Sequence, residues 1–147
     1  MSVVAGYGLA DLLALRGLSR AQLQARVGAL ETDPGVRYEG IEGVDRLHDA
    51  AVFPGHFYYR GDDQQMLYVP RSALKDADLG ELRTALGEPR AVLSSRTGED
   101  SSVYVFPERG VAFATDGEQV EILEIFPPTT LDAYQSGIYK DPGEFIR

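Results

Sequence analysis

Apolar residues at helical spacing alternate along the chain with runs of β-branched and aromatic residues. The helical stripes carry their own boundary signals, because Ser19 with Gln22 and Asp78 with Glu81 form capping boxes and Thr130 is a typical N-cap. Glycines close the first and third of these stripes, at Gly17 and Gly87. The predicted helices span residues 9–16, 19–30, 78–87 and 130–138.

The β-type runs fall into two groups, one before and one after residue 78. Short Gly- and Asp-containing turns separate successive runs, which is typical of antiparallel pairing between neighbours in the chain. The predicted strands are 36–41, 56–60 and 66–69 in the first group, and 91–96, 103–107, 111–115 and 120–126 in the second. The pattern predicts an α+β fold in which helices cover one face of an antiparallel β-meander sheet.

The two groups can be aligned as related halves of one 147-residue domain, 9–74 and 75–139. Placing Gly28 on Gly87 superposes the two capping boxes and their apolar stripes. Capping boxes and terminal glycines also occur in unrelated helices. The alignment therefore has two interpretations: an internal duplication, or capping signals that unrelated helices share.

Residues 78–126 resemble a known half-domain. The segment LGEP (86–89) follows an amphipathic helix, and VYVFP (103–107), GVAF (110–113) and GEQVEI (117–122) come after it. This order resembles the helix and β-meander unit of beta-lactamase-inhibitor-protein-like and small outer-membrane-assembly lipoprotein folds. The resemblance implies a unit that binds proteins and does not catalyse. The lipid-attachment cysteine, export signal and disulfide of those families are missing here, so their extracytoplasmic role is not carried over.

Composition narrows the choice of function. The chain has no cysteine, which excludes disulfides and Cys-based metal sites, and its formal net charge of −9 argues against nucleic acid as a partner. Residues 1–16 lack a basic region, and Asp11 interrupts their apolar stretch, so they predict neither a secretory signal nor a membrane span. We expect a cytoplasmic bacterial protein that meets no membrane and needs no cofactor.

The two histidines form the only plausible metal or catalytic centre in the sequence. If residues 45–49 form a helical turn, Asp45 and Asp49 flank His48, and His56 folds back across Pro54-Gly55. Two imidazoles and one or two carboxylates suit Zn, Mn or Fe(II). The competing interpretation is that both histidines are ordinary structural residues, because no established ligand motif is present.

An aromatic group provides a candidate binding surface: Phe57, Tyr58, Tyr59, Arg60 and Tyr68. Exposed tyrosines near an arginine are typical of interface hot spots. The competing interpretation places Phe57 and Tyr59, or their alternates, in the core. No nucleotide-binding or hydrolase motif occurs, and the carboxylates of Glu121 and Glu124 are expected on a solvated strand face.

The leading hypothesis is a non-catalytic protein-interaction module that binds another protein, or a second copy, through an exposed aromatic sheet face. The alternative is a small metal-dependent enzyme that uses His48 and His56. Phe145 and Ile146 near the C-terminus are expected to dock on the body or in a subunit contact.

Overall fold

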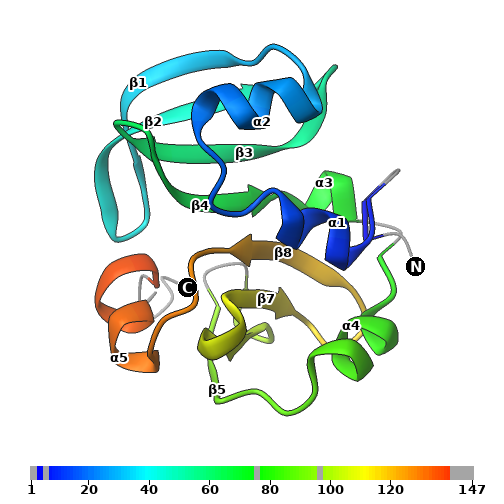
Figure 1. The fold of residues 1–147 in the computed structure, drawn as a ribbon. Coiled ribbons are helices and arrows are strands. Elements are labelled where there is room, and N and C mark those ends of the chain that lie inside the picture. The colour runs from blue at the N-terminus through cyan, green and yellow to red at the C-terminus, as the bar shows by residue number, and fades with distance from the viewer. Residues whose placement is uncertain (1–2, 5–6, 75–76, 96–97, 140–147) are drawn as a thin grey trace.

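Antiparallel strands form one continuous sheet in the computed structural model, which describes residues 3–4, 7–74, 77–95 and 98–139 (Figure 1). In the described residues the sheet has eight strands in the order β1-β2-β3-β4-β8-β7-β6-β5. The strands are β1 Glu31–Tyr38, β2 Ile41–Asp49, β3 Phe53–Arg60, β4 Asp63–Val69, β5 Ala91–Ser94, β6 Ser102–Phe106, β7 Val111–Thr115 and β8 Val120–Ile125. The predicted α+β class and antiparallel meander are confirmed.

Short helices precede or follow each run of strands. They are α1 Leu9–Ala14, α2 Arg20–Val27, α3 Arg71–Leu74, α4 Leu79–Leu86 and α5 Leu131–Ala133, which continues as the π-helix η2 Tyr134–Ile138; a 3₁₀ turn, η1, covers Pro107–Arg109. The predicted caps are observed, since the side chains of Ser19, Asp78 and Thr130 accept backbone N–H bonds at the starts of α2, α4 and α5. The sequence did not predict α3.

The region between α2 and β3 differs most from expectation. We predicted one short strand at 36–41, and the candidate metal site assumed a helical turn at 45–49; the structure has neither. The chain reverses at Glu39-Gly40, so that β1 and β2 form a long hairpin. Glu39 has a φ of 44°, a backbone conformation rare for a residue other than glycine. Residues 45–49 are therefore extended, with alternate side chains on opposite faces of the sheet.

The two halves of the sheet have the same topology. Each half is a helix followed by a four-stranded meander, and the halves meet where β4 pairs with β8. Each also has a register shift at the same place, between Tyr58 and Tyr59 in β3 and between Ala114 and Thr115 in β7. Superposing these shifts places Phe57 on Phe113. The strand register therefore gives a second alignment of the two halves, beside the alignment of their capping boxes.

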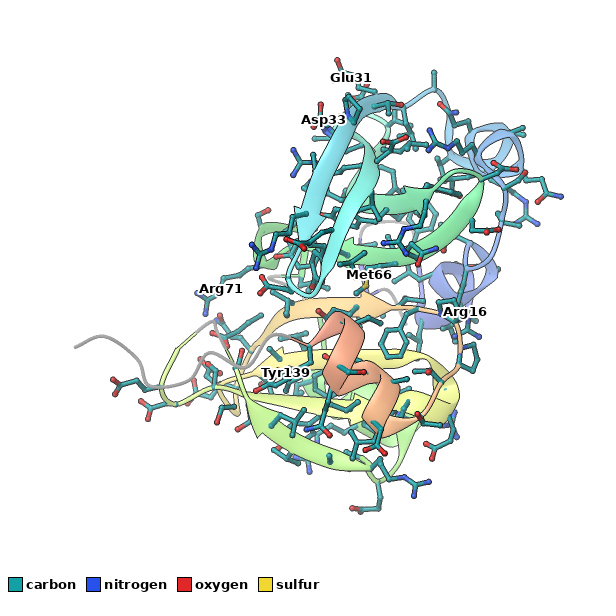
Figure 2. All side chains as sticks on the ribbon, turned by 90° about the vertical axis from the view of Figure 1, so that its left-hand side faces the viewer. Arg16, Glu31, Asp33, Met66, Arg71 and Tyr139 are labelled. Carbon is teal, nitrogen blue, oxygen red and sulfur yellow. The ribbon has the colours of Figure 1, made fainter. Side chains whose placement is uncertain are left out.

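The two faces of the sheet carry separate cores. Leucines of α1, α2, α3 and α4 pack on one face, around Phe57, Tyr59 and Phe113. On the other face α5 and η2 pack across the strands of the second half, with Tyr134 against Phe126 (Figure 2). Helices thus cover one face as predicted, and the C-terminal helix covers half of the other.

The β1–β2 turn contacts this C-terminal helix through main-chain atoms. A Cβ atom at Gly40 would lie 2.0 Å from the carbonyl oxygen of Gly137. No side chain larger than hydrogen fits at Gly40 unless the turn or η2 moves. The turn of the first half is therefore fitted directly against the helix that covers the second.

Both carboxylates that we expected to be solvated are buried, so this expectation is wrong. Glu124 is 2% exposed and lies on the face covered by α5 and η2, where it accepts hydrogen bonds from the hydroxyls of Tyr38 and, at 2.6 Å, Tyr134. It is also directly opposite Tyr68 in the β4–β8 pairing. A buried carboxylate is tolerated only when hydrogen-bonded, and here the donors come from β1 and η2. Glu124 thus links the two halves with the C-terminal helix.

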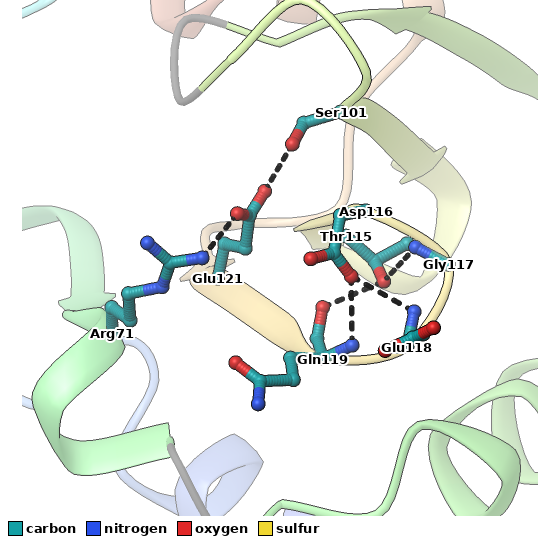
Figure 3. A network of polar contacts seen from close by, with 8 residues as sticks. All are labelled: Arg71, Ser101, Thr115, Asp116, Gly117, Glu118, Gln119 and Glu121. Atoms are coloured by element: carbon teal, nitrogen blue, oxygen red, sulfur yellow. Dashed lines mark hydrogen bonds and ion pairs between the residues drawn. The ribbon is translucent and has the colours of Figure 1, made fainter.

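Glu121, 4% exposed, lies on the opposite face and forms an ion pair with Arg71 of α3 (Figure 3). Its second oxygen accepts a hydrogen bond from Ser101. The neighbouring β7–β8 turn is closed by Asp116, whose carboxylate accepts the backbone N–H groups of Glu118 and Gln119, each at 2.9 Å. These bonds lower the pKa of Asp116. The contacts account for Glu121 and Asp116 as structural residues.

No helix among the described residues is long and apolar enough to cross a membrane. The residues expected to dock near the C-terminus, Phe145 and Ile146, lie outside the described part of the chain.

The bonds to Glu124 predict a measurable cost for a single hydroxyl. Tyr134→Phe removes a donor to a buried carboxylate and is expected to lower the free energy of unfolding by about 1.5–3 kcal/mol. Urea denaturation followed by circular dichroism measures the change. Tyr104→Phe is the matched control, because the Tyr104 hydroxyl makes no hydrogen bond to the described residues, and its effect is expected within about 0.5 kcal/mol. Equal losses in both variants would contradict the role of Glu124.

Candidate functional site

α5 and η2 cover one face of the sheet in the second half. On this face, several positions that are polar in the first half are apolar in the second. With the register shifts superposed, the cross-strand pairs relate each polar residue of the first half to an apolar residue of the second. The related positions are Asp33 and Leu93, Arg46 and Val103, His48 and Val105, His56 and Ala112, and Tyr58 and Ala114. We call the side chains of Asp33, Arg46, His48 and His56 the polar face.

Asp33 organises the polar face from the edge strand β1, where Figure 2 labels it. Its Oδ2 accepts hydrogen bonds from Arg46, at 3.2 Å from Nε and 2.8 Å from Nη2. The same oxygen lies 2.7 Å from Nε2 of His48. The bonds from Arg46 and His48 lower the pKa of Asp33 below its usual value. A paired carboxylate thus fixes the positions of a guanidinium and an imidazole.

The four residues stay accessible to solvent. The side chains of Asp33, Arg46 and His48 are 41%, 34% and 28% exposed, and His56 is half-buried. They project from strands and not from loops, so their spacing is set by the sheet. The polar face is therefore a rigid, partly desolvated surface on which a partner group could replace water.

His56 lies between the polar face and the centre of the sheet. Its ring is 5.5 Å from that of His48 and 6.0 Å from that of Tyr68, measured between centroids. Burial is the main cause that lowers the pKa of His56; the electrostatic effects of Arg46 and His48 act in the same direction, and Asp33 opposes the shift only in part. The environment therefore favours the neutral imidazole.

The aromatic residues predicted to form an exposed binding face are mostly buried. Phe57 and Tyr59 are 0% exposed in the core under the helices, and Tyr58 is 4% exposed on the opposite face. The expectation of exposure is wrong for these three, because both faces of β3 are packed. Tyr68 is half-buried, and Arg60 is exposed and donates to the carbonyl of Glu42 at 3.0 Å.

Arg60 lies in a groove at the other end of the same face. Gly40, Gln65, Pro127 and Gly137 also line this space of about 360 Å³ between the β1–β2 turn, the β3–β4 hairpin and the C-terminal helix. The groove extends the accessible surface beyond the polar face, although no buried charge points into it among the described residues.

The predicted metal-ligand set is only partly brought together. His48 and His56 are cross-strand neighbours, as a shared site requires. Asp45 projects from the opposite face and binds Arg20 at 2.7 Å, while Asp49 accepts the N–H of Ala51 at 3.0 Å. These two carboxylates are therefore corrected to structural roles. In the described ranges, no group of three or more His, Cys, Asp or Glu residues is arranged to hold a metal ion.

Asp33 and Arg46 belong to the cluster but were missed from the sequence. A helical turn at 45–49 places Arg46 and His48 on different sides, whereas a strand places them on the same side, with Leu47 opposite. The alternation of polar Arg46 and His48 with apolar Leu47 was the available signal. Asp33 had no local signal, because its position depends on the β1–β2 register.

No protein-family model, curated protein or solved structure matches this chain.

The lowered pKa of His56 predicts a pH-dependent stability. The unfolded chain takes up a proton near pH 6.5, whereas folded His56 does so only at lower pH. The free energy of unfolding should therefore fall as the pH drops through about 6.5 and level off below the folded pKa. Asp33 affects stability in a separate pH range. Its lowered pKa stabilises the folded chain at neutral pH, and this stabilisation is lost only as the pH falls below the unfolded pKa of about 3.9.

Thermal denaturation of the wild type and His56→Gln between about pH 7.5 and pH 5 tests this dependence. The variant should lose less stability on acidification, since glutamine has no proton to take up. An NMR titration of the wild-type His56 ring should give a midpoint below that of a free imidazole. Parallel acid profiles for both proteins would contradict the shift.

Proposed function

We propose that this chain is a non-catalytic protein-interaction module that binds a partner protein through the polar face. One observation carries the proposal: the equivalent positions of the second half are apolar and lie on the face that α5 and η2 cover, while the first half has charged and titratable side chains there that remain accessible. A sheet of the same topology does not need these residues to fold. Their presence favours a surface selected for contact with another molecule.

The composition of the polar face supports a protein partner. Arginine is enriched in the centres of protein interfaces and among the residues that contribute most to binding. The Asp33–Arg46 pair fixes a guanidinium that can still direct hydrogen bonds outward. Tyr68 borders the cluster and adds a flat aromatic surface.

Two further arguments favour binding over catalysis. The resemblance of residues 78–126 to protein-binding half-domains points the same way. The formal net charge of −9 favours approach of a basic protein, with a rate that falls as salt is added. The acidic surface would then guide the encounter, and the polar face would provide the specific contacts.

Affinity purification from the native host, followed by quantitative mass spectrometry, tests the proposal. Wild type is compared with Arg46→Ala, which removes the central cation of the polar face, and with Arg26→Ala. Arg26 is an exposed arginine of α2, on the helix-covered side of the sheet. A specific partner should be retained by the wild type and by Arg26→Ala, and bind Arg46→Ala at least about tenfold more weakly.

Circular dichroism establishes that both variants are folded. Equal retention of the partner by Arg46→Ala and Arg26→Ala would place the interface elsewhere. The absence of any stoichiometric partner at low salt would argue against an interaction module.

A second candidate, a small metal-dependent enzyme, is favoured by the pairing of His48 with His56. The bond from Asp33 fixes Nε2 of His48 and leaves Nδ1 for a ligand, which is how carboxylates commonly orient metal-binding imidazoles. A neutral His56 is the form that binds metals. This site would have two protein ligands and positions left for water or substrate.

Elemental analysis of protein purified without chelators separates the candidates. A metal-dependent enzyme should carry about one equivalent of metal, which is lost in the His48→Ala, His56→Ala double variant. A folded wild-type protein that contains no metal and binds no added Zn²⁺ in calorimetry would exclude the second candidate.

A further inference from the structure

The two edges of the sheet differ in how they are protected. β1 carries Pro34, two register shifts and three charged residues, all of which hinder pairing with another strand. At the opposite edge, β5 has the sequence Ala-Val-Leu-Ser, with no charge, no proline and no register shift in its pairing with β6. The β1 edge is thus hindered from adding a strand, whereas β5 itself carries none of these hindrances.

The hydrogen-bond pattern shows which backbone groups of β5 point outward. Ser95 donates to the carbonyl of Ser101 at 3.2 Å, so Ala91 and Leu93 also bond to β6. Just before the strand, Arg90 donates to the Val105 carbonyl of β6 at 2.8 Å. Val92 and Ser94 therefore direct their N–H and C=O groups away from the sheet. The Ser94 carbonyl accepts the Tyr139 hydroxyl at 2.8 Å, which agrees with this direction. Val92 is left with an outward donor and an outward acceptor.

The side chain of Val92 adds an apolar surface to this edge. It is 54% exposed and is the only large hydrophobic residue exposed among those the structure describes. Its counterpart in the β1–β2 pairing is Thr32, which is also exposed but lies on the protected edge. Among the described residues, this edge therefore combines the outward backbone groups of Val92 with its exposed side chain.

We infer that β5 pairs antiparallel with β5 of a second copy of this chain, about a two-fold axis at Val92. The N–H of each Val92 then donates to the C=O of the other copy's Val92. These two hydrogen bonds pair the outward backbone groups of Val92 in both copies. Each chain is negatively charged overall, but β5 is uncharged, and Arg90 would face Ser94 of the other copy and not a like charge. The two meanders of one chain already pair antiparallel through β4 and β8, so the contact extends the same sheet.

Cysteine cross-linking tests this register directly, because the chain has no native cysteine. In the inferred dimer the Cα atoms of the two Val92 residues lie about 5.5 Å apart, within disulfide range. Val92→Cys should therefore form a covalent dimer under mild oxidation, and the matched control Thr32→Cys should not. Equal cross-linking of both variants, or none in either, would overturn the inference.

Sedimentation equilibrium from about 1 µM to about 1 mM covers the affinity range of a weak dimer. Wild type should associate, and more strongly as salt screens the net charge, whereas Val92→Lys should remain monomeric with an unchanged melting temperature. A wild type that is monomeric throughout, or a dimer unaffected by Val92→Lys, would contradict pairing through β5. Partner binding through the polar face uses other residues and is measured separately with Arg46→Ala.

Discussion

The buried carboxylate of Glu124 is the constraint on which the arrangement of this fold depends. Glu124 stands in β8 at the junction of the two meanders, where its charge is tolerated only because hydroxyls surround it. Tyr38 reaches it from the edge strand of the first half, and Tyr134 reaches it from the C-terminal helix. The carboxylate of Glu124 therefore has both hydrogen bonds only when the β1–β2 hairpin and the C-terminal helix are both placed against the junction. A polar requirement of this kind favours one arrangement of elements that apolar packing alone would leave less defined.

The two halves show how one topology can serve two purposes. In the second half, apolar residues on the face that α5 and η2 cover pack against these helices, which completes a core. In the first half, Asp33, Arg46, His48 and His56 take the equivalent positions and hold one another through hydrogen bonds. A surface of this kind contributes little to stability, because partly exposed ion pairs gain little over hydration. Its value lies in the contacts it can make with another molecule.

The parts of the fold that were predictable have local causes. Ser19, Asp78 and Thr130 begin helices through their own side chains, and the strands after residue 90 are separated by short turns. The β1–β2 hairpin was not predictable, because Pro34, Gly40 and Gly43 interrupt its alternation and its register is set by β3. The burial of Glu124 was hidden for a similar reason: its donor Tyr38 lies far away in the sequence. Pairing of His48 with His56 was anticipated, but the wrong local conformation assigned it the wrong carboxylates.

The main-chain contact between Gly40 and Gly137 has a consequence for how the halves belong together. The contact, the β4–β8 ladder and the hydrogen bond from Tyr38 to Glu124 are all formed between segments far apart in the chain. None of them depends on the covalent connection from α3 to α4. The contacts between the halves resemble those between two subunits of a dimer. The peptide link keeps the halves close together, and the noncovalent contacts set how they are arranged.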